Sequence, residues 1–484
     1  MWIVAVLLVY VAVLFGISRW TGRRATNASF YRADRRAPWP MVAFGMVGAS
    51  ISGITFVSVP GMVLTSQMTY LQTCMGFIVG YVLVAFVLLP LYYRLNLTSI
   101  YAYLGLRLGP TSHKTGSWFF LLSKMTGAAI KFYVVCIILQ RFVFQPMGVP
   151  FEVTAVGLVL LIWLYTRRGG LKTLVWTDSV QTLCLFTALL LIIYKVVTDL
   201  GIGWGGAVDA VSSSPLSRVF VWDDWLSSHH FWKQFLSGAF IVVVMTGLDQ
   251  DMMQKNLTCR TLRDAQKDMC CYGVAFLPAN LLFLTLGVLL ALLVQQQGGT
   301  LPAIGDDLLP EYIATAANST LSTLNSTLLE VLFALGIVAA SFSSADSALA
   351  SLTTIFCVDI MERSGDERLR KRTHLAMCAV FVVFVLLFRA AGSSSLIDAI
   401  YTLVGYTYGP LLGLFAFGLF TRRGVNDRWV PYICIASPMV CYAIQAGSAA
   451  WFNYHFGYEL LMLNGLLTFA GLWAVSSSES RYTR

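Results

Sequence analysis

The sequence predicts an all-α polytopic membrane protein, because three properties of the chain agree. Hydrophobic residues make up 57% of the 484 residues, charged residues make up 12%, and the mean hydropathy is +0.72. A soluble globular protein is closer to half apolar and a quarter charged. Long apolar stretches also recur from one end to the other with short polar loops between them. We therefore expect a single membrane domain and no separate soluble domain.

The apolar stretches set the expected number of membrane spans. A transmembrane helix needs roughly 20 predominantly apolar residues. Thirteen stretches fit this pattern, at residues 2–18, 40–65, 72–93, 117–144, 151–166, 173–198, 231–247, 269–294, 328–357, 372–391, 395–420, 430–446 and 458–475. The sequence thus predicts about thirteen transmembrane helices in a multi-pass protein of the cell (inner) membrane.

Charge in the loops predicts the orientation. Loops rich in Lys and Arg stay in the cytoplasm. Such loops alternate along the chain, at 19–36, 94–116, 167–172, 248–268, 358–372 and 421–429. The loops at 199–230 and 295–327 are mainly acidic. We therefore expect the N-terminus outside and the C-terminus inside. The net charge of +9 comes from these short loops, so it does not indicate a nucleic-acid partner.

Two spans carry residues that interrupt helices. Residues 45–61 contain glycines, serines and a threonine in mid-span and end in Pro60-Gly61, and residues 237–250 contain Ser237-Gly238 and Thr246-Gly247. Unwound backbone at membrane depth survives only where it lines a cavity. Broken helices in matching places of two opposed halves are typical of transporters with inverted repeats. The alternative is close packing, because small residues let membrane helices approach one another.

A polar cluster stands in the span at 328–357. Ala340, Ser343, Ser344 and Ser347 lie at offsets 0, 3, 4 and 7, which places them on one helix face, and Asp346 lies beside them. Ionisable groups inside a bilayer usually face a polar cavity, an ion or a partner. The cluster therefore indicates a cation-coupled transporter. The serines alternatively bond back to their own helix.

Two further intramembrane charges are Asp178 and Lys131. Asp178 either binds a cation or forms a cap or a salt bridge, for example to Lys172. Lys131 lies about 14 residues into its span, or roughly 21 Å, near the midplane. It either neutralises a buried carboxylate or binds an anionic substrate. Lys124 is close enough to the cytoplasmic end of the span to reach the surface.

At these residues the chain resembles the sodium:solute symporter family. The matching pieces are Ala49–Gly61, Gly80–Tyr93, Leu97–Leu104, Gly169–Leu171, Trp176–Asp178, Asp249–Asn256, Ser343-Ser344 and Gly405–Gly413. The resemblance implies a leucine-transporter-type fold, with ten core helices in two inverted five-helix repeats over residues 37–424. A leading helix and first cytoplasmic loop at 1–36 precede this core, and two trailing helices with a short tail at 425–484 follow it.

The resemblance also implies cation sites. A first sodium is expected at Gly48, Ile51, Ala340, Ser343 and Ser344. Some members hold a second sodium, for which the matching residues are Asp178, Ser343, Asp346 and Ser347. The two carboxylates at this second position suit a second cation, and they also suit a proton. The expected number of sodium ions is therefore one or two.

The substrate contacts follow from the same resemblance. The segments at 68–104 and 117–140 are most similar to the bacterial branch that includes sialic acid symporters. In that branch the substrate contacts match Ser50, Ser52, Thr55, Gln72 and, in place of an arginine, Lys131. A lysine is a point charge and does not form the two-pronged grip of a guanidinium on a carboxylate.

The predicted function is sodium-coupled symport of a small organic solute by alternating access, the solute being a sugar or an acidic sugar such as sialic acid. The alternatives are symport of a monocarboxylate or other small anion, and a proton-coupled carrier. A channel and a transporter-like sensor are further alternatives, and no enzyme motif such as HExxH is present. The expected partners are the substrate, sodium and the lipid bilayer, and we expect a monomer.

Overall fold

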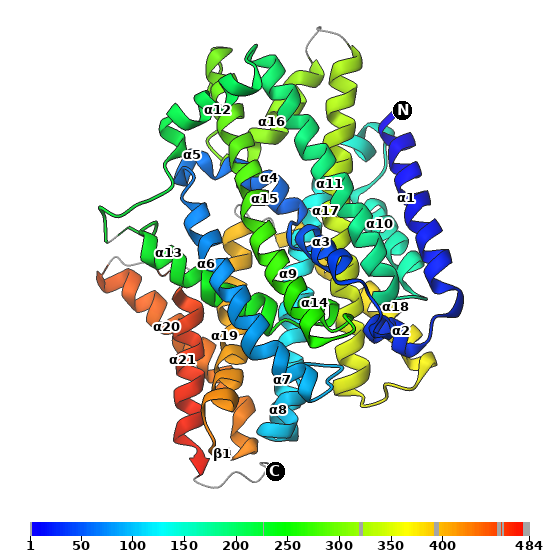
Figure 1. The fold of residues 1–484 in the computed structure, drawn as a ribbon, viewed down its shortest axis with the longest axis vertical. Helices are drawn as coiled ribbons and strands as arrows, with labels where there is room; N and C mark the ends of the chain where they lie inside the picture. Colours follow the sequence, from blue (N-terminus) through cyan, green and yellow to red (C-terminus); the bar gives the residue numbers. More distant parts are fainter. Residues whose placement is uncertain are drawn as a thin grey trace.

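Long α-helices form almost the whole molecule, and most of them run roughly along its long axis (Figure 1). This architecture is that of a computed structural model of the chain, which describes residues 2–225, 227–318, 323–391, 396–452, 456 and 459–477. The prediction of an all-α protein is confirmed. The two short strands, β1 (Gly424–Val425) and β2 (Ser476–Ser477), pair antiparallel beside the last helices.

Within the described residues, eight helices are long and apolar enough to cross a membrane. They are α1 (Trp2–Thr21), α6 (Tyr70–Leu83) continuing into α7 (Leu89–Arg94), α9 (Pro110–Leu139), α11 (Leu171–Asp199), α15 (Leu262–Gln296), α17 (Thr323–Ile355), α18 (Glu367–Ala391) and α20 (Val430–Phe452). The number rises to as many as ten if each of two bent helix pairs is counted as one span. The other three predicted spans are also helical, as α10 (Phe151–Thr166), α19 (Leu396–Phe420) and α21 (Glu459–Ala474).

The first bent pair is the predicted interruption at residues 45–61. Helix α3 (Trp39–Ser50) ends at Ser50, and α4 (Gly53–Gly61) leaves at 62° to it and continues into α5 (Val63–Ser66). The new helix begins with a capping box. The backbone N–H of Thr55 donates to Ser52 Oγ at 3.4 Å, and the backbone N–H of Ser52 donates to Thr55 Oγ1 at 3.3 Å. The side chains of Ser52 and Thr55 therefore fix the place at which the helix restarts.

The second bent pair is the predicted interruption at residues 237–250. Helix α13 (Phe231–Val242) runs into a π-helical turn, and α14 (Gln250–Asn256) departs at 72° to it. Asp249 caps α14, because its Oδ1 accepts from the backbone N–H of Asp251 at 2.8 Å and of Met252 at 3.4 Å. The sequence predicts a loop at residues 248–268, whereas the structure has the helix α14 within this stretch, and most residues of α14 are buried.

The bent pairs lie inside the helical assembly. Helix α3 packs against α11 and α15, α11 packs against α17, and α6 packs against α13. Two glycines permit close approaches. A Cβ on Gly48 would come within 2.0 Å of Thr182 Oγ1 on α11, and one on Gly238 would come within 2.3 Å of the Thr73 carbonyl oxygen on α6. The small residues of the two interruptions therefore also serve close packing, as the alternative reading proposed.

The remaining elements lie around these helices. In Figure 1, α1 stands at one edge of the assembly, and α20 and α21 stand at the opposite lower edge beside α19. The shorter helices of the connections are α2 (Asn27–Arg32), α8 (Ala102–Arg107), α12 (Trp204–Ser213) and α16 (Leu308–Asn318).

Candidate functional site

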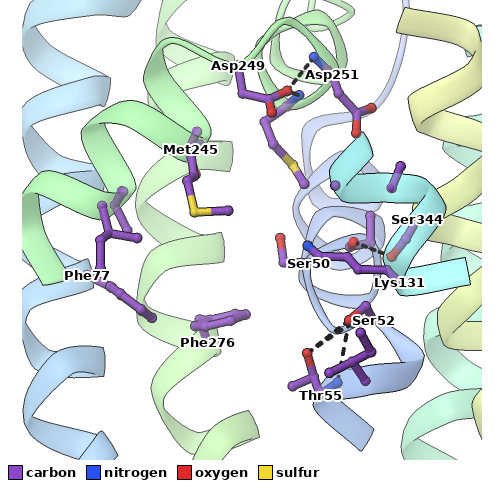
Figure 2. Close-up of a pocket in the computed structure, with 18 of the residues that line it drawn as sticks. Ser50, Ser52, Thr55, Phe77, Lys131, Met245, Asp249, Asp251, Phe276 and Ser344 are labelled. Atoms are coloured by element: carbon purple, nitrogen blue, oxygen red, sulfur yellow. Dashed lines mark hydrogen bonds between the residues drawn. The ribbon is translucent and has the colours of Figure 1, made fainter. Parts of the chain in front are cut away.

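A cavity of about 210 Å³ opens where the two bent helix pairs face each other. Its lining comes from both interruptions and from the unbroken helices around them, namely α6, α9, α15, α17 and α19. Figure 2 shows its two unlike walls. Phe77, Met245 and Phe276 lie on one side, and hydroxyl and charged side chains lie on the other. An apolar cleft with a few convergent polar groups is the usual form of a small-molecule site.

The hydroxyl groups of this wall belong to the first interruption. Ser50, Ser52 and Thr55, all predicted substrate contacts, line the cavity together. Ser50 Oγ lies 2.5 Å from the hydroxyl of Tyr272, which also accepts a hydrogen bond of 2.8 Å from the Tyr81 hydroxyl. Both tyrosines line the cavity as well. The two tyrosines were not predicted from the sequence, because an isolated tyrosine in an apolar span carries no distinctive pattern.

Gln72, the fourth predicted substrate contact, is the exception. It is not among the residues that line the described cavity, and its side chain is fully buried. Its Nε2 donates to the His229 carbonyl oxygen at 3.0 Å and to Gln234 Oε1 at 2.9 Å, and its Oε1 accepts from the Val221 backbone N–H at 3.2 Å. This corrects the expectation for Gln72. Both ends of its amide bind to α13 or to the segment before it, so neither is presented to a ligand.

Lys131, the fifth predicted contact, lines the cavity (Figure 2). It forms no ion pair with any residue that the structure describes. Lys124, seven residues earlier on the same helix, does form ion pairs. Its Nζ lies 3.1 Å from Asp249 Oδ2 and 2.7 Å from Asp251 Oδ2, and it is only 14% exposed. Lys124 therefore does not extend to the surface as predicted, because it is held by two buried carboxylates.

Asp249 and Asp251 place a carboxylate pair at one end of the cavity. Asp249 Oδ2 also accepts a hydrogen bond of 2.7 Å from the hydroxyl of Tyr408 on α19. The ion pairs thus join α9 to the start of α14, and the Tyr408 hydrogen bond adds α19.

The predicted first sodium residues come from the end of α3 and from α17. Gly48 and Ile51 belong to the interruption, and Ala340, Ser343 and Ser344 follow one another on α17. Ser344 Oγ donates to the carbonyl oxygens of Ala49, at 3.0 Å, and of Ala340, at 3.1 Å. The C-terminal end of a helix carries partial negative charge and unpaired carbonyl groups. The break in α3 therefore directs suitable oxygen ligands toward α17.

The second predicted set lies on α11 and α17. The Oδ1 atom of Asp178 accepts a hydrogen bond of 2.8 Å from Ser343 Oγ. Its Oδ2 lies 2.8 Å from the Nζ of Lys255, and the two side chains are 2% and 3% exposed. Lys172, which the sequence analysis offered as a partner of Asp178, pairs instead with Asp34 at 3.1 Å.

Asp346 is the second carboxylate of this set. Its Oδ2 accepts from the Tyr165 hydroxyl at 2.6 Å, and its Oδ1 accepts from Ser347 Oγ at 3.3 Å. Asp346 and Ser347 are both almost fully buried. The residues of the second set are therefore already engaged with one another or with other parts of the protein.

The broken helices, the central cavity and the buried ionic groups together define a secondary transporter of the membrane. The family is shown by direct comparison. The profile of the sodium:solute symporter family matches residues 30–428, and the chain belongs to that family. It is therefore a sodium-coupled symporter of a small solute and not an enzyme, and it is a multi-pass protein of the cell (inner) membrane.

Curated relatives match over nearly the whole chain. The sodium/sialic acid symporter NanT of Aliivibrio fischeri is 26% identical over 485 residues, which cover 96% of this chain and 92% of the relative. The sodium/sialic acid symporter SiaT of Proteus mirabilis is 25% identical, with 93% and 91% covered. Both sequence matches thus extend over more than nine tenths of the chain.

Solved structures confirm the fold. A substrate-bound, outward-open Na⁺-coupled sialic acid symporter superposes with a TM-score of 0.82 at 22% identity, covering 99% of both chains. Mhp1, a nucleobase-cation-symport transporter, superposes with a TM-score of 0.58 at 14% identity, covering 95% of this chain and 97% of its own. The predicted leucine-transporter-type architecture is thus confirmed as a fold.

Proposed function

We propose that the chain carries an acidic sugar of the sialic acid type together with sodium, by alternating access. The observation that carries this proposal is the Lys131 ammonium, which lines the cavity without an ion pair among the described residues. A buried or half-buried ammonium needs a negative partner. A carboxylate of the substrate supplies that partner. The sialic acid substrates named for NanT and SiaT support this choice of solute.

The charges of the cavity favour a substrate with one negative charge. Lys124 and Lys131 are balanced by Asp249 and Asp251, so the four lining groups sum to zero. One sodium adds a positive charge, and a monoanionic substrate cancels it. An uncompensated charge in a low-dielectric site is costly.

The two walls of the cavity suit the two faces of such a sugar. We propose that Ser50, Ser52 and Thr55 exchange hydrogen bonds with sugar hydroxyl groups. Phe77 and Phe276 on the opposite wall contact the less polar face of the ring (Figure 2). Gln72 has no direct part in this proposal, because its amide is engaged with His229, Gln234 and Val221.

We propose that the coupling sodium binds at the first site, formed by Gly48, Ile51, Ala340, Ser343 and Ser344. The link to the substrate is Ser344, which lines the cavity and also bonds to the Ala49 carbonyl oxygen. A cation at this place pulls the end of α3 and the middle of α17 together. Because Ser50 and Ser52 belong to the same break, the cation also fixes the substrate-binding hydroxyls.

The finer topology is also a proposal. We propose thirteen spans with the N-terminus outside and the C-terminus inside, a core of two inverted five-helix repeats over residues 37–424, and a single chain as the transporting unit. The two bent pairs and the helices at all thirteen predicted positions support it. In intact cells, a membrane-impermeant maleimide should label S212C and not S364C on a cysteine-free background. Labelling of S364C and not of S212C would show the opposite orientation, with the N-terminus inside.

Uptake into proteoliposomes tests the function. With an inward sodium gradient, radiolabelled N-acetylneuraminic acid should accumulate, and replacing sodium by choline should abolish the accumulation. Excess unlabelled galactose or lactate tests the alternatives of a neutral sugar and a small monocarboxylate, and neither should compete strongly. Sodium-driven uptake of galactose or lactate, with no uptake of the acidic sugar, would overturn the proposed substrate. A proton gradient that drives uptake without sodium would overturn the proposed coupling ion.

A further inference from the structure

A buried lysine lies at the position where the family resemblance places a second sodium. Lys255 is on α14, immediately after the second helix break, and its Nζ is 2.8 Å from Asp178 Oδ2. We propose that the Lys255 ammonium is a built-in cation that neutralises Asp178 permanently, so that the chain binds one sodium, at the first site, and none at the second. This inference rests on the proposed first sodium site.

Both oxygens of Asp178 have a partner within the protein, one in an ion pair and one in a hydrogen bond. Lys255 takes Oδ2, and Ser343 Oγ donates to Oδ1 at 2.8 Å. A sodium ion at Asp178 would therefore lie next to an ammonium group that is 3% exposed. Like charges that are this close in a low-dielectric interior repel each other strongly.

The other expected ligands of a second sodium are engaged as well. Ser343 and Ser347 each direct a hydroxyl hydrogen to a carboxylate, at Asp178 and Asp346 respectively. The remaining oxygen of Asp346 accepts from the Tyr165 hydroxyl at 2.6 Å. The four residues of the second set thus have protein partners, so no cation is required to satisfy their hydrogen bonds.

The same helix carries a second charge that belongs to the cavity. Asp251 stands four residues before Lys255 on α14, which puts the two side chains one helical turn apart. Asp251 lines the cavity and pairs with Lys124, whereas Lys255 pairs with Asp178. Helix α14 therefore ties the charged end of the cavity to α11 and α17. The Lys255 ammonium is covalently part of α14 and so cannot leave the site, whereas a bound sodium ion would dissociate.

Equilibrium binding of ²²Na⁺ to the purified, detergent-solubilised protein tests the inference without any substrate. The parent protein should bind one sodium per chain. Lys255→Met removes the ammonium and keeps an unbranched side chain, so Asp178 becomes available and the count should rise to two. Lys255→Arg keeps the charge and should leave the count at one. The double variant Asp178→Asn/Lys255→Met removes both charges and should also bind one.

The possible outcomes distinguish a failure of the Lys255 inference from a failure of the proposed first sodium site. Two sodium ions on the parent protein, falling to one in Asp178→Asn, would overturn the inference. A folded Lys255→Met protein that still binds one sodium would overturn it too. If Lys255→Met does not fold, the numbers of sodium ions bound by the parent protein and by the double variant are compared instead. One sodium ion on each supports the inference, and two on the parent protein contradict it. No sodium binding in any variant would instead refute the proposed first site.

Discussion

Ser344 Oγ donates a hydrogen bond of 3.0 Å to the carbonyl oxygen of Ala49, and so joins the middle of α17 to the last turn of α3 where that helix breaks. The serine also donates to Ala340 within its own helix. Its hydroxyl oxygen keeps lone pairs that remain available to a cation. This contact brings the proposed sodium ligands of two helices into one place, next to the hydroxyl wall of the cavity.

Removing a hydroxyl from this place should weaken sodium binding. We expect Ser344→Ala and Ser343→Ala each to reduce sodium affinity by about tenfold, equivalent to about 1.4 kcal/mol, because each loses one oxygen from a small coordination shell. Ser351→Ala is the matched control, since Ser351 is a buried serine of α17 whose hydroxyl donates to the Ala348 carbonyl oxygen of its own helix. Sodium-activation curves for uptake give the measurement. Unchanged sodium affinity in both variants would show that the first site lies elsewhere.

Gln72 should prove to be a structural residue. Gln72→Ala leaves the Val221 N–H and the partners of the amide nitrogen unpaired, and each buried unpaired group costs about 1–3 kcal/mol. We expect a lower thermal unfolding temperature and a substrate KM within about twofold of the parent value. Gln234→Ala, which removes a partner of Gln72, should have a similar effect. A large rise in KM for Gln72→Ala alone, with normal stability, would restore it to the substrate site.

The sequence predicted those features that depend on neighbouring residues. The glycine-rich run before Pro60 and the serine cluster at Ser343-Ser344 are local patterns, and the structure has a helix break at the first and interhelical hydrogen bonds at the second. The apolar lengths likewise predicted where the helices lie. These patterns require no knowledge of which helices meet.

The charge pairs were not predictable in the same way. Lys124 and Lys255 find their partners on other helices, and no local spacing indicates which carboxylate each one meets. Helix α14 has seven residues, most of them polar, and lies after a 72° bend. Hydropathy therefore reads it as a loop, and its charges were counted with the cytoplasmic ones. Burial of such a segment depends on tertiary packing alone.

The Asp178–Lys255 pair should also matter for stability. Asp178→Asn leaves the Lys255 ammonium buried without a counter-charge, and breaking a buried pair in this way costs about 3–5 kcal/mol. We expect a marked fall in the thermal unfolding temperature, partly recovered in Asp178→Asn/Lys255→Met. Lys172→Met is the control, because its pair with Asp34 is about one third exposed and such pairs contribute about 0–1 kcal/mol. Equal effects of Asp178→Asn and Lys172→Met would contradict this account.

The last prediction concerns Lys131 and the charge of the substrate. Lys131→Met removes the one lining ammonium that lacks an ion pair among the described residues, so it should abolish binding of the acidic sugar. Sodium binding should persist, because the proposed sodium ligands lie on α3 and α17. Lys131→Arg should retain or improve substrate binding, since a guanidinium grips a carboxylate with two hydrogen bonds. Thermal shift with N-acetylneuraminic acid, with and without sodium, measures both effects. Survival of acidic-sugar binding in a folded Lys131→Met protein would show that Lys131 is a structural counter-charge and that the substrate carboxylate binds elsewhere.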